Sequence, residues 1–206
     1  MAVKKILTLG RYEKILRSRS EPVKKINRDV RQLVEDIKET IDANPAAGLA
    51  AVQIGVLQRV FGARLGQRDE ETDDETLPTT IFINPEIVEI SEEVERGFDG
   101  CLSIPGMWGY TDRALRIKVR YQDERGTPTE GIFEGYDARV ILHEYDHLEG
   151  VLFLDRLSTL DDLFVVAKDS DGKTINIPYP EAVKNAERSA AQPASKAAGS
   201  DVPRRA

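Results

Sequence analysis

The stretch RVILHEYDHLEG, residues 139–150, holds both histidines of this 206-residue chain, four positions apart. We predict a helix over residues 137–149, ended near Gly150, because glycine is typical of the position just after a helix. Positions i and i+4 lie on one helical face, one turn apart. The imidazoles of His143 and His147 are therefore predicted to bind one metal ion.

A glutamate follows the first histidine. Glu144 is turned by about 100° around the helix axis from His143, so it can reach a water on the metal without being a ligand. Two imidazoles and a carboxylate that accepts the water's proton are typical of metallohydrolases. A helix with two surface histidines is the alternative interpretation.

The third metal ligand cannot be a histidine. Catalytic sites usually have three protein ligands, and one protease class continues the motif as HExxHxxGxxH. This chain matches that pattern as far as Gly150 and then has Phe153. A carboxylate or Cys101 must complete the set. Cys101 lies in GFDGCLSIPG, where glycine and proline favour a sharply turned, exposed backbone, although a lone cysteine is more often a small core residue.

Composition restricts the kind of protein. Apolar residues make up 40% and charged residues 32%, which indicates one soluble globular domain. A net charge of −7 argues against DNA binding. A single cysteine favours a reducing compartment, and no segment has the length or the pattern of a signal peptide or a membrane span. We expect a cytoplasmic protein without membrane contact.

The order of the predicted elements indicates an α+β fold with antiparallel sheet, because strands precede a late helix without regular alternation. A first helix runs from Asn27, its N-cap, to Ala43. The small residues of AAGLAAVQIGV suggest a strand edge or loop. Residues 1–183 are predicted to form one catalytic domain and residues 184–206 a disordered tail. The remaining predicted segments are an acidic surface loop, 66–78, and strands at 79–90, 115–122 and 127–134.

Three segments, AAGLAAVQ (46–53), DGCLS (99–103) and HEYDHLEG (143–150), resemble in order and separation the three motifs of peptide deformylases, GxGxAAxQ, EGCLS and QHExDHLxG. The resemblance covers about residues 5–158. It implies antiparallel sheets packed around a central helix that carries the HExxH motif, together with the N-terminal helix. The implied activity is removal of the formyl group from the formylmethionine of nascent polypeptides, with release of formate.

The resemblance also implies roles for individual residues. Glu144 would be the general base, and the Gln53 side chain and the Leu102 backbone amide would polarise the formyl oxygen. The implied partners are formylated nascent peptides and, through the tail, the ribosome. The implied cofactor is one divalent ion, Fe²⁺ first and Zn²⁺, Ni²⁺ or Co²⁺ as substitutes. The implied metal ligands are Cys101, His143 and His147, and the implied substrate-binding residues are Gly48, Leu49, Gly100, Tyr136 and Val140, with Arg139 nearby.

Three positions depart from the family motifs. Ala46 replaces a glycine, so if that position needs a positive φ, either the alanine is strained or the loop takes another course. Asp99 replaces a glutamate, so its bond to Arg113 is expected to weaken or to pass through water. Leu142 replaces a glutamine before the first histidine. Trp108 is expected either to contact substrate or to pack in the core or rim.

Two other functions fit the same residues. A metalloprotease would cut peptides that carry no formyl group. A weakly active or non-catalytic relative would hold a structural or sensory metal, and only the three departures support it.

Overall fold

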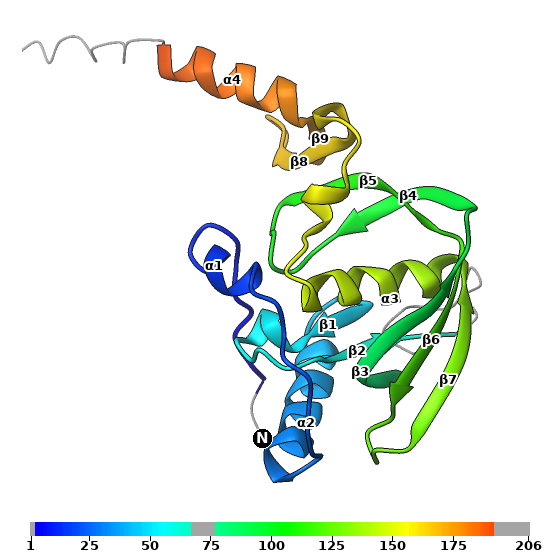
Figure 1. Ribbon diagram of the computed structural model, residues 1–206. Coiled ribbons are helices and arrows are strands. Elements are labelled where there is room, and N and C mark those ends of the chain that lie inside the picture. Colours follow the sequence, from blue (N-terminus) through cyan, green and yellow to red (C-terminus); the bar gives the residue numbers. More distant parts are fainter. Residues whose placement is uncertain (1–2, 67–76, 192–206) are drawn as a thin grey trace, which may run out of the picture.

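The computed structural model describes residues 3–66 and 77–191, and it contains two antiparallel sheets with a helix between them (Figure 1). The helix, α3 (Gly135–Leu148), carries both histidines. The α+β class is therefore confirmed. The first sheet has the order β1 (Gly48–Ala50), β2 (Val60–Arg64), β3 (Thr79–Ile90), β6 (Arg116–Gln122), β7 (Pro128–Glu134). The second has the order β4 (Val94–Gly100), β5 (Met107–Ala114), β8 (Leu163–Lys168), β9 (Thr174–Pro178).

Helix α2 (Arg28–Asp42) covers the outer face of β1 and β2. It begins at Asn27, as predicted, and the Asn27 side chain accepts a hydrogen bond from the Val30 amide at 3.0 Å. Its apolar residues at helical spacing are buried against the sheet. At Gly62 of β2 an added Cβ would lie 2.9 Å from Ile37 and from Ile41, so the helix can approach this strand only because the residue is glycine.

Helix α3 packs on the opposite face of the same strands. One buried cluster of apolar side chains includes Ala138, Ile141 and Leu148 of α3 together with Phe61 and Phe82 of the sheet. All five residues of β2 are buried because α2 and α3 lie on its two faces. The chain enters α3 directly from the β6–β7 hairpin, whose Ile117 and Val119 face this core as their alternation predicted.

The second sheet positions the cysteine segment. Strand β4 pairs with β5 from Val94↔Ala114 to Gly100↔Trp108, and Cys101 follows β4 directly in the turn between the two strands. Strand β5 in turn lies against α3. A third cluster, which includes Leu16, Ile104 and Phe153, joins this turn to α1 (Glu13–Leu16) and to η3 (Phe153–Arg156).

The C-terminal part differs from the prediction. Strands β8 and β9 form a hairpin, η4 (Leu160–Asp162) precedes it, and α4 (Tyr179–Ala191) follows it. Residues 184–191 are therefore helical, and the predicted start of a disordered tail at residue 184 is wrong. The rest of that tail and residues 67–76 of the acidic loop lie outside the described residues. Within the described ranges, no helix is long and apolar enough to cross a membrane.

Candidate active site

The three predicted metal ligands lie together. One ligand atom from each of Cys101, His143 and His147 falls within 4.8 Å of the others. The Cys101 sulfur is 3.2 Å from Nε2 of His147, and the two imidazole rings of α3 have centroids 5.0 Å apart. Among the described residues this is the group of His, Cys, Asp or Glu side chains that could hold a metal ion, which favours the cysteine over a carboxylate as the third ligand. A thiolate with two imidazoles suits Fe²⁺, Zn²⁺, Co²⁺ or Ni²⁺.

Asp99, the last residue but one of β4, holds the first imidazole. Its Oδ1 lies 2.5 Å from Nδ1 of His143, and its Oδ2 accepts from Nε of Arg113 at 2.8 Å and from the Thr111 hydroxyl at 2.9 Å. A carboxylate on Nδ1 fixes the ring so that Nε2 serves as the ligand atom. The bond from Arg113 is direct, so the expected water bridge is wrong, whereas the weakening of this bond stays a prediction.

Charges set the protonation of these groups. Burial alone would raise the pKa of Asp99, but the charge and hydrogen bond of His143 and the charge of Arg113 lower it below its usual range. Burial would likewise raise the pKa of the Cys101 thiol, and the charge of His147 with hydrogen bonds from both imidazoles lowers it well below its usual value. The thiolate is the form of cysteine that binds metal.

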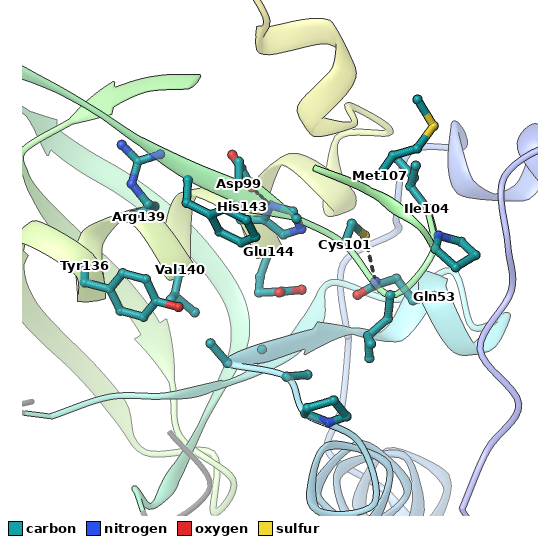
Figure 2. A pocket seen from close by; sticks show the side chains of 18 of the residues that line it. Gln53, Asp99, Cys101, Ile104, Met107, Tyr136, Arg139, Val140, His143 and Glu144 are labelled. Atoms are coloured by element: carbon teal, nitrogen blue, oxygen red, sulfur yellow. Dashed lines mark hydrogen bonds and ion pairs between the residues drawn. The ribbon is translucent and has the colours of Figure 1, made fainter. Parts of the chain in front are cut away.

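Glu144 projects into the same space (Figure 2). Its side chain is 3% exposed, and burial raises the pKa of the carboxyl to about 7. Within the described part of the chain, its Oε2 is buried without a hydrogen-bond partner, which is costly unless a bound group completes the site. Gly48 leaves room for this carboxylate, because a Cβ on Gly48 would lie 2.6 Å from Oε1. A carboxyl with this pKa can both accept and donate a proton near neutrality.

Gln53 is oriented by the backbone. It belongs to η1 (Ala51–Ile54), and its Oε1 accepts from the Ala50 amide at 2.8 Å. That bond turns Nε2 toward Cys101 Sγ at 3.4 Å, as Figure 2 shows. Nε2 also lies 3.2 Å from Ser103 Oγ. The side chain is 2% exposed and therefore presents a fixed donor beside the sulfur.

A cavity of about 500 Å³ opens over this group. Of the residues predicted to bind substrate, Gly48, Gly100, Tyr136 and Val140 line it, and so does Leu102. Leu49 is different, because its side chain is fully buried in the core under α2. A substrate contact at Leu49 therefore stays a prediction for its backbone in β1 alone.

The other departures have structural explanations. Ala46 lies at the cavity rim without a positive φ, so the expected strain is absent. Leu142 packs against the core between α3 and the first sheet, where an apolar side chain is favourable. Trp108 stacks on Phe164 with ring centroids 4.5 Å apart and donates to Asn176 at 3.0 Å. The packing role of Trp108 is confirmed.

Sequence reasoning missed a further buried carboxylate of this site. Asp146, between the two histidines, accepts from Arg113 Nη1 at 2.9 Å and from Arg156 Nη2 at 2.5 Å. Arg113 therefore joins Asp146 to Asp99 and ties α3 to β4 and β5. The sequence did contain a signal for this contact. Asp146 lies on the predicted helix between the two histidines, and a buried carboxylate needs a cationic or hydrogen-bonding partner.

Comparisons with known proteins agree with this geometry. The family model for polypeptide deformylase matches residues 3–162. A peptide deformylase of Pseudothermotoga lettingae is 42% identical over 153 residues, which are 74% of this chain and 82% of that protein. The crystal structure of a peptide deformylase from Thermotoga maritima matches with a TM-score of 0.69 and 39% identity, over 77% of this chain and 100% of that one.

A second solved structure of a similar protein contains a bound peptide. A peptide deformylase from Acinetobacter baumannii, with Met-Ala-Ser bound, matches with a TM-score of 0.68 and 31% identity, over 76% of this chain and 99% of that one. The matched sequence, the shared fold and the Cys/His/His group lead to one conclusion. The chain belongs to the polypeptide deformylase family.

Proposed function

We propose that this chain removes the formyl group from the N-terminal formylmethionine of nascent polypeptides and releases formate, as a metal-dependent hydrolase. One observation carries the proposal. In a chain of this family, the possible metal ligands Cys101, His143 and His147 lie together beside the buried Glu144.

Cys101, His143 and His147 would hold the metal ion. When bound, a divalent ion there supplies a Lewis acid and lowers the pKa of water. We propose Fe²⁺ as the native ion, as the family resemblance implies. Zn²⁺, Ni²⁺ or Co²⁺ can replace it, because thiolate and imidazole ligands accept all four ions.

Glu144 moves the proton. It takes a proton from the attacking water and passes it to the amine nitrogen as the C–N bond breaks, which a carboxyl with a pKa of about 7 can do in both directions. The Gln53 amide and the Leu102 backbone N–H donate to the former carbonyl oxygen, where negative charge develops. Loss of one such donor costs about a hundredfold to a thousandfold in rate.

The substrate backbone would lie beside β1. This strand is at the edge of its sheet, so an extended peptide can add to it through the backbone of Gly48 and Leu49. The first side chain of the peptide would then enter the cavity between Gly100, Tyr136 and Val140. The relative with bound Met-Ala-Ser supports this placement, because that peptide is what deformylation of formyl-Met-Ala-Ser would leave.

The finer partner and location are also proposals. Residues 184–206 contain five Lys or Arg and two Asp or Glu, a net of +3 that leaves −10 on the remaining chain. We place the enzyme in the cytoplasm, with this segment attracted to ribosomal RNA. Deleting residues 184–206 should reduce co-sedimentation with ribosomes at low salt, and unchanged co-sedimentation would refute the ribosome contact.

A formate-release assay tests the reaction. Anaerobic enzyme with measured metal content should release formate from formyl-Met-Ala-Ser. Glu144→Gln should keep the metal and lose turnover, because the amide cannot carry the proton. Cleavage of unformylated peptides would indicate a peptidase instead. Full activity in Glu144→Gln would refute the role of this carboxylate.

A further inference from the structure

Arg156 reaches from the protein surface to a buried carboxylate of α3. Its side chain is 48% exposed and belongs to η3, the short helix that follows α3. Nη2 donates to Oδ1 of Asp146 at 2.5 Å, and Nε donates to Oδ2 at 3.1 Å. Two nitrogens on two oxygens form a fork that holds a carboxylate in one orientation. Asp146 is therefore fixed from outside, although only 8% of its side chain is exposed.

Asp146 continues this contact toward the interior. Its Oδ2 also accepts from Nη1 of Arg113 at 2.9 Å. The other nitrogens of Arg113 face Asp99, with Nε 2.8 Å and Nη2 2.7 Å from Oδ2. Oδ1 of Asp99 lies 2.5 Å from Nδ1 of His143, and Figure 2 shows this carboxylate beside the ring. Charges of alternating sign therefore lead in one line from Arg156 to a predicted metal ligand.

The two arginines of this line balance its two carboxylates. In the described part of the chain, the ion-pair partners of Asp146 are Arg113 and Arg156. Without Arg156, both buried carboxylates would have to share Arg113. Asp146 would then compete with Asp99 for one guanidinium, because a buried charge that loses a partner is costly. Arg156 therefore keeps Arg113 available to Asp99.

Asp99 is the group that such a competition would disturb. A carboxylate on Nδ1 sets the orientation of a metal-binding imidazole and the basicity of its other nitrogen. Hydrogen bonds in a low-dielectric interior polarise one another, so a loss at one end of a network affects the other end. The orientation of the His143 ring therefore depends on an arginine that is separated from it by three residues of this line.

We propose that Arg156 is a positioning residue, which acts from the protein surface on the metal ligand His143 through this line of charges. The proposal rests on the metal site of the proposed function, but not on the reaction. Groups that hold the ligands of a metal typically account for a tenfold to hundredfold difference in metal affinity. Because Arg156 acts through three other residues, we expect the lower end of that range, about tenfold.

Arg17 provides a matched control on the same element. It forms a comparable fork with Asp155 of η3, with distances of 2.7 Å and 3.2 Å, and its side chain is 37% exposed. In the described ranges, Asp155 otherwise accepts only from the Leu152 amide, so this pair does not lead to a metal ligand. If Arg156 served only to attach η3 to the body of the protein, loss of either arginine would have the same effect.

Binding of Co²⁺ tests the proposal without substrate or turnover. Metal-free protein would be titrated at neutral pH in competition with a chromophoric chelator, and the visible absorption of bound Co²⁺ reports on its ligands. Arg156→Gln should raise the Kd for Co²⁺ about tenfold and shift the absorption bands. Arg156→Lys keeps the charge without the fork and should return the Kd to within about threefold of wild type. Arg17→Gln should keep the wild-type Kd and spectrum. An unchanged Kd in Arg156→Gln, or an equal change in Arg17→Gln, overturns the proposal.

A paired substitution tests the route through Asp146. Asp146→Asn removes the competing charge, so in that background Arg156→Gln should change the Kd less than about twofold. Equal effects in both backgrounds would refute the route. If Arg156→Gln does not fold, the same comparison is made with Arg156→Lys, whose smaller increase in Kd should also disappear beside Asp146→Asn. Wild-type protein that binds no Co²⁺ would overturn this inference together with the metal site. Wild-type protein that binds Co²⁺ and releases no formate would contradict the proposed reaction alone.

Discussion

At the scale of single residues, Gly48 controls where the Glu144 carboxylate lies. Its φ is in the ordinary range, so alanine would not strain the backbone, but the new Cβ would lie 2.6 Å from Oε1. The carboxylate would have to move by about an ångström. We expect Gly48→Ala to lower kcat about a hundredfold, because displacements of this size at a reacting group have that effect.

Formate release, unfolding temperature and bound metal, measured on the same sample of Gly48→Ala, check this expectation. Metal content and stability should remain close to wild type, because the three atoms nearest to the added Cβ all belong to Glu144 and none to a predicted metal ligand. A variant with unchanged kcat would show that Glu144 tolerates the Cβ and that its position is not limiting.

At Ala46, in contrast to Gly48, we expect a substitution to have little effect on activity. This residue replaces the family's glycine, yet its backbone does not need a positive φ. Ala46→Gly should therefore leave kcat/KM within about twofold and reduce the free energy of unfolding by about 0.4–1 kcal/mol, since glycine increases the entropy of the unfolded chain. Urea unfolding and formate release measure both. A large gain in activity would mean that the alanine restrains the cavity rim.

The residue scale is also where the sequence was most informative. Helical spacing alone was enough to place His143, Glu144 and His147 at neighbouring positions of one helix. The third ligand remained open, because the approach of Cys101 to α3 depends on how β4 is placed. The contact of Asp99 with Arg113 joins β4 to β5 and likewise has no local signature, so only the family resemblance indicated this pair.

At the scale of elements, the end of α3 depends on Gly150. Its φ is 73°, and an added Cβ would lie 2.4 Å from the Arg17 carbonyl oxygen. Gly150→Ala therefore combines an unfavourable backbone conformation, about 1–3 kcal/mol, with a collision against backbone. Gly172 in the β8–β9 turn is the matched control, because its φ is 78° and an added Cβ meets nothing within 4 Å. Chemical denaturation should show a clearly larger loss for Gly150→Ala; equal losses would mean that the Arg17 segment can move away.

The pair of Arg17 and Asp155 ties the segment after α1 to η3 at 2.7 Å. Burial would raise the pKa of Asp155, but the hydrogen bond and charge of Arg17 lower it. A lowered pKa in the folded state means that the stabilisation is present above the unfolded pKa and is lost as pH falls through the folded value. Both side chains are more than a third exposed, so about 0.2–1 kcal/mol is at stake.

Asp155→Asn isolates this charge, because the amide oxygen can still accept from the Leu152 N–H. Its unfolding temperature should lie below wild type at pH 7, and the difference should shrink toward pH 3. Thermal unfolding across that range is the measurement. A difference that does not depend on pH would assign the effect to packing rather than to charge.

Elements with strong local patterns were predicted well. The periodicity after Asn27 gave α2, and alternation gave β3, β6 and β7. Strand β4 was missed because its VERGFDG sequence is mostly charged or glycine and largely exposed, so it has no clear apolar alternation. The β8–β9 hairpin did carry a turn signal, Asp171-Gly172, which could have identified it.

At the scale of the whole molecule, the site joins two layers. Cys101 follows β4 of the second sheet, whereas both imidazoles belong to α3, which packs on the first sheet. The buried chain of Asp99, Arg113 and Asp146 makes the same connection through charge. Local sequence patterns could not predict this arrangement, because each part is a short segment and only the packing of the sheets brings them together. The resemblance to a family was the signal that implied the meeting of the cysteine with the two histidines.

Removal of the metal should therefore loosen one layer against the other. A ligand present at a hundred times its Kd stabilises the folded state by about 2.7 kcal/mol, and chelation removes that contribution. We expect a chelator to lower the unfolding temperature of the wild type and to increase amide hydrogen exchange in β4, β5 and the turn at Cys101. Strand β2, buried between α2 and α3, should keep its protection.

Cys101→Ala should already show the lower stability and should respond little to the chelator. A uniform rise in exchange that includes β2 would instead mean that the ion supports the whole fold and not the contact between its layers.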